Sequence, residues 1–466
     1  MGSTLSSTAM LWCGVTCAVT VTTVLQTSSA SVVLPPSVPS AGEIEQDALT
    51  LTPILQRLQA KTFFKIFKAD LSKECPFYAM EAMCQNPQGC SVCECDEDDI
   101  PKPWQMKPVE NFVDRSHSED LSFTPWKETD RYDLSSVWEA PPGSPEAFAQ
   151  LISGEASHKA TYVDLTLNRP SYTAYSGGHI WYLIYRENCL ESDETCLDEE
   201  NFYRIISGMH SNIAALSAEY YHVPERHNGA IETHGSGGGG SGVGSRYSYS
   251  MSFYKAKLGP YDDRIANLYF TLAILLRTVC HVSPILEECH CETGNKSEDL
   301  QARADLFHLL NHTFASCRPQ YMDEPLFEKK SSEALRQFHN ITRILDCVEC
   351  EKCRLHGRLK MTALSLALRA SAADYRVVSL ERNEIVALIN ALAYFAEAIH
   401  IVRRFESRLY RERLLVAAGV LGVLAVTCVV FYRLVLGVAR KRKAYLSVFR
   451  VRKASSPSSP PKDKAI

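Results

Sequence analysis

Apolar residues recur at helical spacing over most of the chain, and alternating strand patterns are scarce. The segments RIANLYFTLAILLRTV and RNEIVALINALAYFAEAIHIVRRF show this spacing, and so does EENFYRIISGMHSNIAALSAEYY. In the last of these, the apolar positions are Phe202, Ile205, Ile206, Met209, Ile213, Leu216 and Tyr220. The pattern predicts a mainly α fold, in which residues 55–412 form a single helical domain with long loops.

Both ends of the chain carry apolar segments. Residues 10–25 precede several small residues, which predicts a signal peptide over residues 1–30. The basic residues that usually begin such a peptide are missing, so an uncleaved anchor stays open. Near the other end, residues 414–432 carry no charge, and we expect a single transmembrane helix over residues 413–439. The remaining segments are a flexible lead-in at 31–54, a Gly/Ser-rich insertion at 234–250 and a basic, disordered tail at 440–466.

The 17 cysteines are the unusual feature of the composition. The formal net charge of -5 gives no sign of nucleic-acid binding. Three N-glycosylation sequons begin at Asn295, Asn311 and Asn340. Together with the expected signal peptide, they indicate the secretory pathway, an oxidising compartment in which cysteines form disulfides. The domain at 55–412 would then be luminal and the tail cytosolic.

One cysteine cluster, DCVECEKC, contains Cys347, Cys350 and Cys353. If the segment is helical, residues three apart share a face and lie within disulfide reach. Residues six apart are separated by about 9 Å along the helix axis, which is too far. Cys350 can therefore pair with either neighbour, and one cysteine needs a distant partner.

A second cluster contains Cys75, Cys84, Cys90, Cys93 and Cys95. Pro87 and Gly89 predict a loop between Cys84 and Cys90. Spacing alone leaves three interpretations of the two clusters: structural disulfides, redox pairs that exchange with other thiols, and zinc ligands. An oxidising lumen argues against zinc, because a metal needs free thiolates. We therefore predict no metal.

Several ordered stretches carry a resemblance to a known family. They are FFKIFKADLSKECPFY, YVDLTLNRPSYTAYSGGHIWYLIYRENC, FYRIISGMHSNIAALSAEYY, RIANLYFTLAILLR and FHNITRILDCVECEKCRLHGRLK. In this order they resemble the endoplasmic reticulum oxidoreductins, flavin-dependent thiol oxidases. The resemblance implies a helical domain that holds FAD, reoxidises protein disulfide isomerase and passes electrons to molecular oxygen, giving hydrogen peroxide. Together with the span expected at 413–439, it predicts a single-pass protein of the endoplasmic reticulum membrane.

The resemblance assigns roles to the cysteines. Cys350 and Cys353 match the inner, catalytic pair beside the flavin. Cys84 and Cys90 match the outer, shuttle pair, although five residues separate them here and four in the family. A Cys84–Cys93 shuttle therefore stays open. The implied structural disulfides are Cys75–Cys347 and Cys189–Cys196.

The resemblance also assigns the residues that contact the flavin. They are Thr173, Tyr175, Trp181, Ser207, His210, Arg264 and Arg277. Ser171 stands where the family has an arginine, and Arg169 could compensate for it. On residue type alone, Trp181 reads as a core residue and His210 as a helix histidine with its hydrogen bonds satisfied.

Two observations concern the alternatives. No G-x-G-x-x-G sequence follows a predicted strand, so the sequence does not support a Rossmann-type cofactor site. A competing interpretation is a non-catalytic, disulfide-rich membrane ectodomain that acts as a binding module and has lost its flavin. It predicts cysteine pairs that do not exchange.

Overall fold

The computed structural model describes residues 38–69, 91–105, 161–169, 178–188, 196–219, 250–259, 262–313, 350–371 and 379–454, with single residues and short pieces between them. The chain divides into two compact units. One is Val32–Phe405, and the other comprises Met1–Ser31 and Glu406–Ile466.

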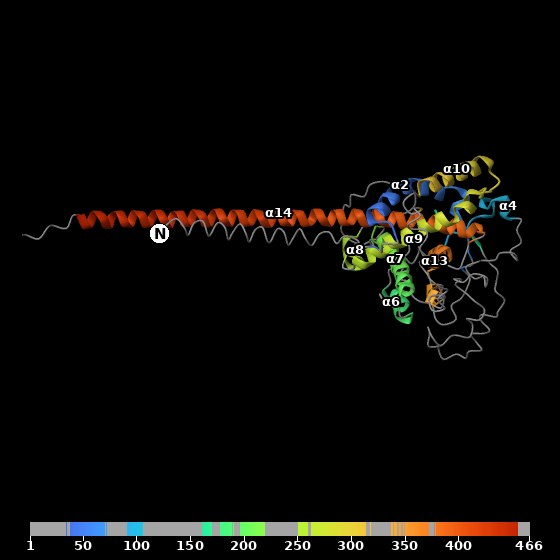
Figure 1. Ribbon diagram of the computed structural model, residues 1–466, viewed down its shortest axis with the longest axis horizontal. Coiled ribbons are helices and arrows are strands. Elements are labelled where there is room, and N and C mark those ends of the chain that lie inside the picture. The colour runs from blue at the N-terminus through green and yellow to red at the C-terminus, as the bar shows by residue number, and fades with distance from the viewer. Residues whose placement is uncertain are drawn as a thin grey trace, which may run out of the picture. The chain divides into compact units, whose positions relative to one another are not determined.

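Three long helices form the core of unit Val32–Phe405 (Figure 1). Helix α9 (Asp262–Glu287) packs against both α7 (Leu197–Glu219) and α13 (Glu351–Ser371). Most of the apolar stretch of α9 is buried, which identifies it as a core helix although it is long enough to cross a membrane. The predicted mainly α fold is confirmed.

Gly208 fixes the closest approach between α7 and α9. A Cβ atom at this position would overlap with Thr271 Oγ1 and with the backbone carbonyl of Asn267, both on α9. The Asn267 amide also donates a hydrogen bond to Ser207 Oγ, with an N···O distance of 3.0 Å. The glycine therefore lets the two backbones meet at the turn that carries Ser207 and His210.

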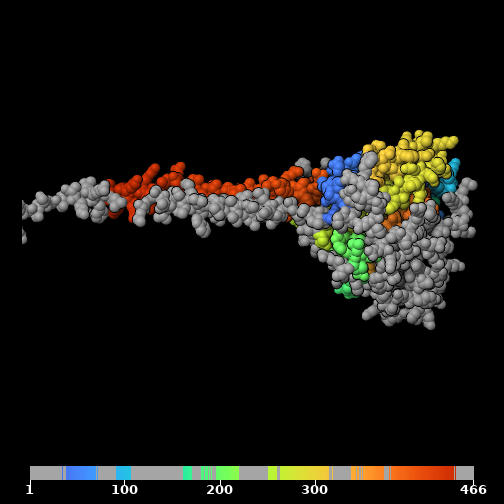
Figure 2. All heavy atoms as spheres, viewed as in Figure 1, coloured from blue at the N-terminus to red at the C-terminus, as the bar shows by residue number. Residues whose placement is uncertain are grey.

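The flexible lead-in expected at residues 31–54 is wrong for residues 41–54. They belong to α2 (Ala41–Gln59), which begins with a capping box between Ser40 and Glu43. One face of α2 is buried, with Ile44, Ala48, Leu51, Ile54, Leu55 and Leu58. This burial stabilises the helix despite Pro53. In the space-filling view, α2 lies beside α10 (Lys296–His312), and the two helices are in contact (Figure 2).

A small antiparallel sheet joins segments that lie far apart in sequence. Strand β1 (Ile66–Ala69) follows the short helix α3 (Thr62–Lys65) and pairs with β2 (Thr161–Asp164). Phe67 faces Val163 in the register, and Glu94 forms a further bridge with Val163. The segment 91–105, with the 3-10 helix η2 (Glu97–Asp99) and α4 (Lys102–Gln105), thereby lies along this sheet.

The remaining helices are α6 (Gly178–Glu187), α8 (Met251–Lys257) and α14 (Arg382–Ala454). The first part of α14 is buried in unit Val32–Phe405. There Tyr394 O accepts a hydrogen bond from Asn212 on α7, with an N···O distance of 2.8 Å. A buried ion pair between Arg369 and Glu384 links α13 to α14.

The C-terminal part of α14 contains the predicted span at 413–439. By length and composition this helix is able to cross a membrane, and its apolar side chains, among them Leu415 and Val423, are exposed. The disordered tail expected at 440–466 is wrong for residues 440–454, because α14 continues to Ala454. The expected signal peptide, the Gly/Ser-rich insertion up to residue 249 and residues 455–466 lie outside the described residues.

Candidate active site

The inner cysteine pair lies at the N-terminus of α13. Cys350 immediately precedes the helix, and its carbonyl accepts a hydrogen bond from the Arg354 N–H at 2.9 Å. Cys353 lies in the first turn of the helix. Cys347 lies outside the described residues. Cys350 is 2 % exposed and Cys353 is 0 % exposed, so the pair is buried.

Both ends of the outer cysteine segment are tied to this first turn. Before the segment, Leu71 O accepts a hydrogen bond from Arg354 Nη1 at 2.8 Å. After it, the Val92 N–H donates to the carboxylate of Glu351 at 2.9 Å. Cys75, Cys84 and Cys90 all lie between these two anchors in the sequence, outside the described residues.

Asn168 is a second link between the outer segment and α13. Its buried amide accepts from the Cys93 N–H and donates to the Cys93 carbonyl, each at 2.7 Å. Its own backbone carbonyl accepts a hydrogen bond from His356 Nε2. Because a carbonyl can only accept, His356 carries its proton on Nε2. Asn168 therefore links the backbone of Cys93 to His356, which lies one turn of α13 after Cys353.

The two cysteines of the outer cluster that the structure describes differ in environment. Cys93 is exposed and carries a free thiol. Cys95 is half-buried, and burial together with Asp164 and Asp99 raises its thiol pKa to about 11. A thiol attacks as its thiolate, so Cys95 is a poor nucleophile at neutral pH. Between the two, only Cys93 suits exchange.

Two buried basic side chains, His356 and Lys360, follow Cys353 on the same face of α13. Burial lowers the pKa of Lys360 to about 7, although attraction to Cys353 opposes this shift. Burial also lowers the pKa of His356 to about 3, so its imidazole is neutral. Both side chains contact the ring of Tyr394, at 5.4 Å from the Lys360 Nζ and 5.8 Å from the His356 ring. This face therefore places a basic nitrogen within electrostatic reach of the Cys353 sulfur.

Three of the residues expected to contact the flavin form a cluster between α6 and α7. The rings of Trp181 and His210 stack with their centroids 4.0 Å apart and their planes 9° apart. The Tyr185 hydroxyl lies 3.3 Å from His210 Nδ1. Burial, with Arg264 and Lys257, holds the pKa of His210 well below 6.5. Ser207 is buried one turn before His210.

The two expected arginines lie on α9. Arg264, in the first turn, donates to Lys257 O at 2.8 Å. Arg277 is buried thirteen residues further on, which corresponds to about 20 Å along the helix. An extended dinucleotide needs aromatic rings for stacking and positive charges for its phosphates. The aromatic rings and the two separated guanidinium groups supply both, so these residues fit FAD. Thr173, Tyr175 and Ser171 lie outside the described residues.

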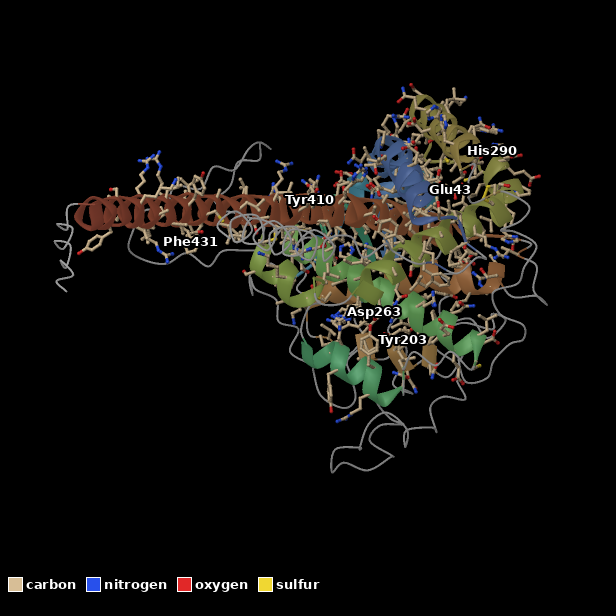
Figure 3. The ribbon with its side chains drawn as sticks, turned by 60° about the vertical axis from the view of Figure 1, so that its left-hand side comes forward. Glu43, Tyr203, Asp263, His290, Tyr410 and Phe431 are labelled. Atoms are coloured by element: carbon tan, nitrogen blue, oxygen red, sulfur yellow. A yellow bond between two sulfur atoms is a disulfide. The ribbon has the colours of Figure 1, made fainter. Side chains whose placement is uncertain are left out.

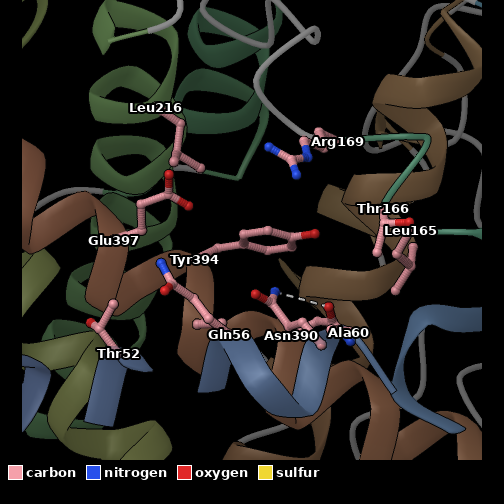
Figure 4. A pocket seen from close by; sticks show the side chains of 12 residues that line it. Thr52, Gln56, Ala60, Leu165, Thr166, Arg169, Leu216, Asn390, Tyr394 and Glu397 are labelled. Atoms are coloured by element: carbon pink, nitrogen blue, oxygen red, sulfur yellow. Dashed lines mark hydrogen bonds between the residues drawn. The ribbon is translucent and has the colours of Figure 1, made fainter. Parts of the chain in front are cut away.

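A cavity of about 350 Å³ lies beside Tyr394 (Figure 4). Arg169, Glu397 and Leu216 contribute to its lining. None of Trp181, Ser207, His210, Arg264 and Arg277 lines it. Arg169, which could compensate for Ser171, therefore lines a cavity that none of these flavin-contact residues lines, and its role stays a prediction.

The remaining cysteine predictions stay predictions, and the structure adds one disulfide. Cys196 carries a free thiol, and its expected partner Cys189 lies outside the described residues, so this disulfide stays a prediction. The Cys75–Cys347 bond lies outside them too. A disulfide that the sequence did not assign joins Cys280 to Cys317. Within the described part of the chain, no cluster of metal-binding side chains is found.

Sequence reasoning missed the side chains that tie the outer segment to α13: Asn168, Glu351 and Arg354. Their contacts join residues 75 to 283 positions apart, and no local pattern reports such distances. His356 and Lys360 could have been found, because they follow Cys353 at helical spacing.

Comparison with known proteins agrees with this arrangement. Residues 50–402 match the family model "Endoplasmic Reticulum Oxidoreductin 1 (ERO1)". "Endoplasmic reticulum oxidoreductin-1" of Arabidopsis thaliana is 32% identical over 372 residues, which are 76% of this chain and 75% of that protein. "ERO1-like protein alpha" of Mus musculus is 29% identical, covering 76% of this chain and 86% of that protein.

The fold is also similar to a solved structure. A mutant of S. cerevisiae Ero1p superposes with a TM-score of 0.52 and 22% identity, covering 80% of this chain and 99% of that chain. The family match spans the anchored outer segment, the expected flavin contacts and the inner cysteine pair. The chain is therefore an oxidoreductase that belongs to the endoplasmic reticulum oxidoreductin 1 family.

Proposed function

We propose that the protein is a flavin-dependent thiol oxidase of the endoplasmic reticulum membrane that reoxidises protein disulfide isomerase. Electrons enter at the outer pair Cys84–Cys90, pass to the inner pair Cys350–Cys353, and reach FAD and then molecular oxygen, giving hydrogen peroxide. The catalytic domain faces the lumen, and the single C-terminal span holds it at the membrane.

One observation carries this proposal. Leu71 and Val92, at the two ends of the outer segment, are hydrogen-bonded to the first turn of α13, the helix that holds the inner pair. Arg354 binds Leu71 and Glu351 binds Val92, and these two side chains lie on either side of Cys353 in the sequence. The segment that carries the outer cysteines therefore begins and ends at the helix turn that holds Cys353. A structural disulfide network would not require this proximity.

The chain's own residues account for the exchange steps. A thiolate of the isomerase attacks one sulfur of the outer disulfide, and the mixed disulfide resolves when the isomerase's second thiolate attacks it. The reduced outer pair then attacks the inner disulfide in the same way. The inner pair lies at the N-terminus of α13. Lys360 adds a basic nitrogen that is attracted to the Cys353 thiolate.

The expected flavin residues hold the cofactor. Trp181 and His210 offer planar surfaces for stacking, and Arg264 and Arg277 offer positive charge for phosphates. A neutral His210 suits a stacking role, because a buried imidazolium would repel the nearby Arg264. When bound, the flavin supplies the transfer of electrons from thiols to oxygen.

The test is an absorption spectrum of the full chain purified in detergent. We expect a flavin band that bleaches when reduced protein disulfide isomerase is added under nitrogen and returns in air. Cys350→Ser and Cys353→Ser should keep the band and lose the bleaching. Cys428→Ser, in the apolar part of α14, is the matched control and should bleach like the wild type.

Each other outcome points elsewhere. A folded, colourless protein would support the competing interpretation, a membrane ectodomain that has lost its flavin. A band that still bleaches in Cys353→Ser would show that electrons bypass the inner pair. Bleaching that survives Cys84→Ser but not Cys93→Ser would move the shuttle role to Cys93.

A further inference from the structure

The connection between α9 and α10 carries a third pair of cysteines, which the proposed relay does not use. Cys289 and Cys291 flank His290 in the sequence ECHCETG. His290 is exposed at the end of α9, Cys289 is half-buried and Cys291 is 1 % exposed (Figure 3). The two Sγ atoms lie 3.8 Å apart, so the structure brings the thiols into contact.

The backbone around the pair is held in an unfavourable conformation. Cys291 has a φ of 52°, in the left-handed region that residues other than glycine rarely adopt. Two hydrogen bonds, made by the two residues that follow Cys291, hold this turn in place. Trp104 Nε1 donates to Glu292 O at 3.1 Å, and the Thr293 N–H donates to Asp299 Oδ1 at 3.1 Å. Backbone strain that the neighbouring structure maintains is typical of functional positions.

The environment makes the two thiols chemically different. A hydrogen bond from the Cys291 thiol, together with the charge of Arg303 on α10, lowers the pKa of Cys289 to about 7, and burial and Glu292 oppose this shift. The pKa of Cys291 is raised by its hydrogen bond to Cys289, by burial and by Asp299. Cys289 is thus the attacking thiol and Cys291 the resolving one.

We propose that Cys289 and Cys291 form a further thiol–disulfide exchange site, separate from the relay, that accessible disulfides such as glutathione disulfide oxidise. The Cys289 thiolate attacks one sulfur of the disulfide, forms a mixed disulfide and releases one thiolate. Cys291 gives its proton to that thiolate and attacks the Cys289 sulfur, which releases the second thiolate. This second thiolate takes up from the solvent the proton that Cys289 lost when it ionised. Two protein thiols are oxidised to one disulfide, and the incoming disulfide is reduced to two thiols.

A structural role explains this pair poorly. Crosslinking stabilises a fold by shortening the loops of the unfolded chain, and a bond between residues two apart removes little of that freedom. The same region already has a crosslink that spans 37 residues, Cys280–Cys317. The contraction needed, from 3.8 Å to a bond of about 2.05 Å, is small.

The site can be tested on the full chain in detergent under nitrogen, reduced and then incubated with glutathione disulfide. Glu288 and Glu292 flank the pair, so a protease that cleaves after glutamate releases residues 289–292 free of Cys280 and of any glycan at Asn295. Mass spectrometry should find this fragment lighter by two hydrogens. In the Cys291→Ala variant, the fragment should instead carry glutathione on Cys289.

Alkylation rates provide a second measurement. At about pH 7, a pKa near 7 gives about 50 times more thiolate than the ordinary 9.0, and lower nucleophilicity offsets most of this gain. We expect the alkylation of Cys289 to be about fivefold faster than in Cys291→Ala. The midpoint of the alkylation rate plotted against pH should lie near pH 7 and should move to higher pH in the variant.

Two results would overturn the proposal. One is a fragment that stays reduced in glutathione disulfide and alkylates at the same rate in both proteins. The other is a fragment found crosslinked to a different cysteine of the chain. Neither result depends on flavin or on the relay, so failure here leaves the proposed oxidase function intact.

Discussion

At the scale of single residues, the site is governed by ionisable groups placed where water does not reach. Lys360 is the clearest example, because a fully buried lysine would not be expected on the core face of a helix. Its amine lies over the Tyr394 ring on one side and is attracted to Cys353 on the other. The residue therefore costs stability, and we infer that it is kept for its effect on the sulfur.

This placement predicts how stability varies with pH. Lys360 has a pKa of about 7 when folded and 10.5 ordinarily, so between these values the unfolded chain binds the extra proton. Stability then rises with pH from about 7 to about 10.5 and is flat below that window. Lys360→Met should raise the melting temperature more at about pH 6 than at about pH 10. An equal gain at both values would mean that the lysine is protonated in the fold.

At the scale of elements, the close crossing of α7 and α9 decides where the expected flavin residues lie. Gly208→Ala forces a Cβ into Thr271 and the Asn267 carbonyl, and such overpacking typically costs about 1–3 kcal/mol. Its matched control is Gly42→Ala in the first turn of α2, where no atom lies within 4 Å of the added Cβ. Thermal unfolding should show a lower melting temperature and earlier flavin release for the first variant alone.

The Cys280–Cys317 crosslink is a second prediction at this scale. It closes a sequence separation of 37 residues, for which the chain-entropy model gives about 4 kcal/mol of stabilisation. Cys280→Ala should lower the melting temperature under non-reducing conditions, and Cys317→Ala should lower it equally, because either change removes the same bond. A larger loss in the double variant than in either single one would contradict this pairing.

The helices themselves were largely predictable from the sequence, because a long apolar stripe at helical spacing has few alternatives. Helices α7 and α9 and the buried part of α14 follow their patterns closely. The pattern of α2 was overlooked because Pro53 and the neighbouring Ser and Thr residues suggested a linker. The roles of Cys350 and Cys353 came from family resemblance. The anchoring of the outer segment by Arg354 and Glu351 depends on tertiary contacts that spacing cannot report.

At the scale of the whole molecule, the three sequons are not equivalent. Asn295 and Asn311 are exposed, and Asn295 uses only its side-chain oxygen to cap α10. Asn340 is 4 % exposed, and the fold leaves no room for a glycan on its amide. The protein is expressed in the secretory pathway, and its N-glycans are then removed enzymatically. We expect this removal to increase its electrophoretic mobility, and the double variant Asn295→Gln/Asn311→Gln should abolish the increase. A residual shift in that double variant would place a glycan on Asn340 and contradict the burial.

The burial of Cys350 and Cys353 also affects the surroundings of the protein. If the inner pair were exposed to solvent, small thiols in the compartment would reduce it directly. The oxidase would then consume oxygen for as long as those thiols were present. Under the proposed function, electrons reach this buried pair from the outer cysteines, whose segment is anchored at Leu71 and Val92. Under the proposed function, oxygen consumption then follows the arrival of unfinished client proteins, and the thiol buffer of the lumen is insulated from the enzyme it surrounds.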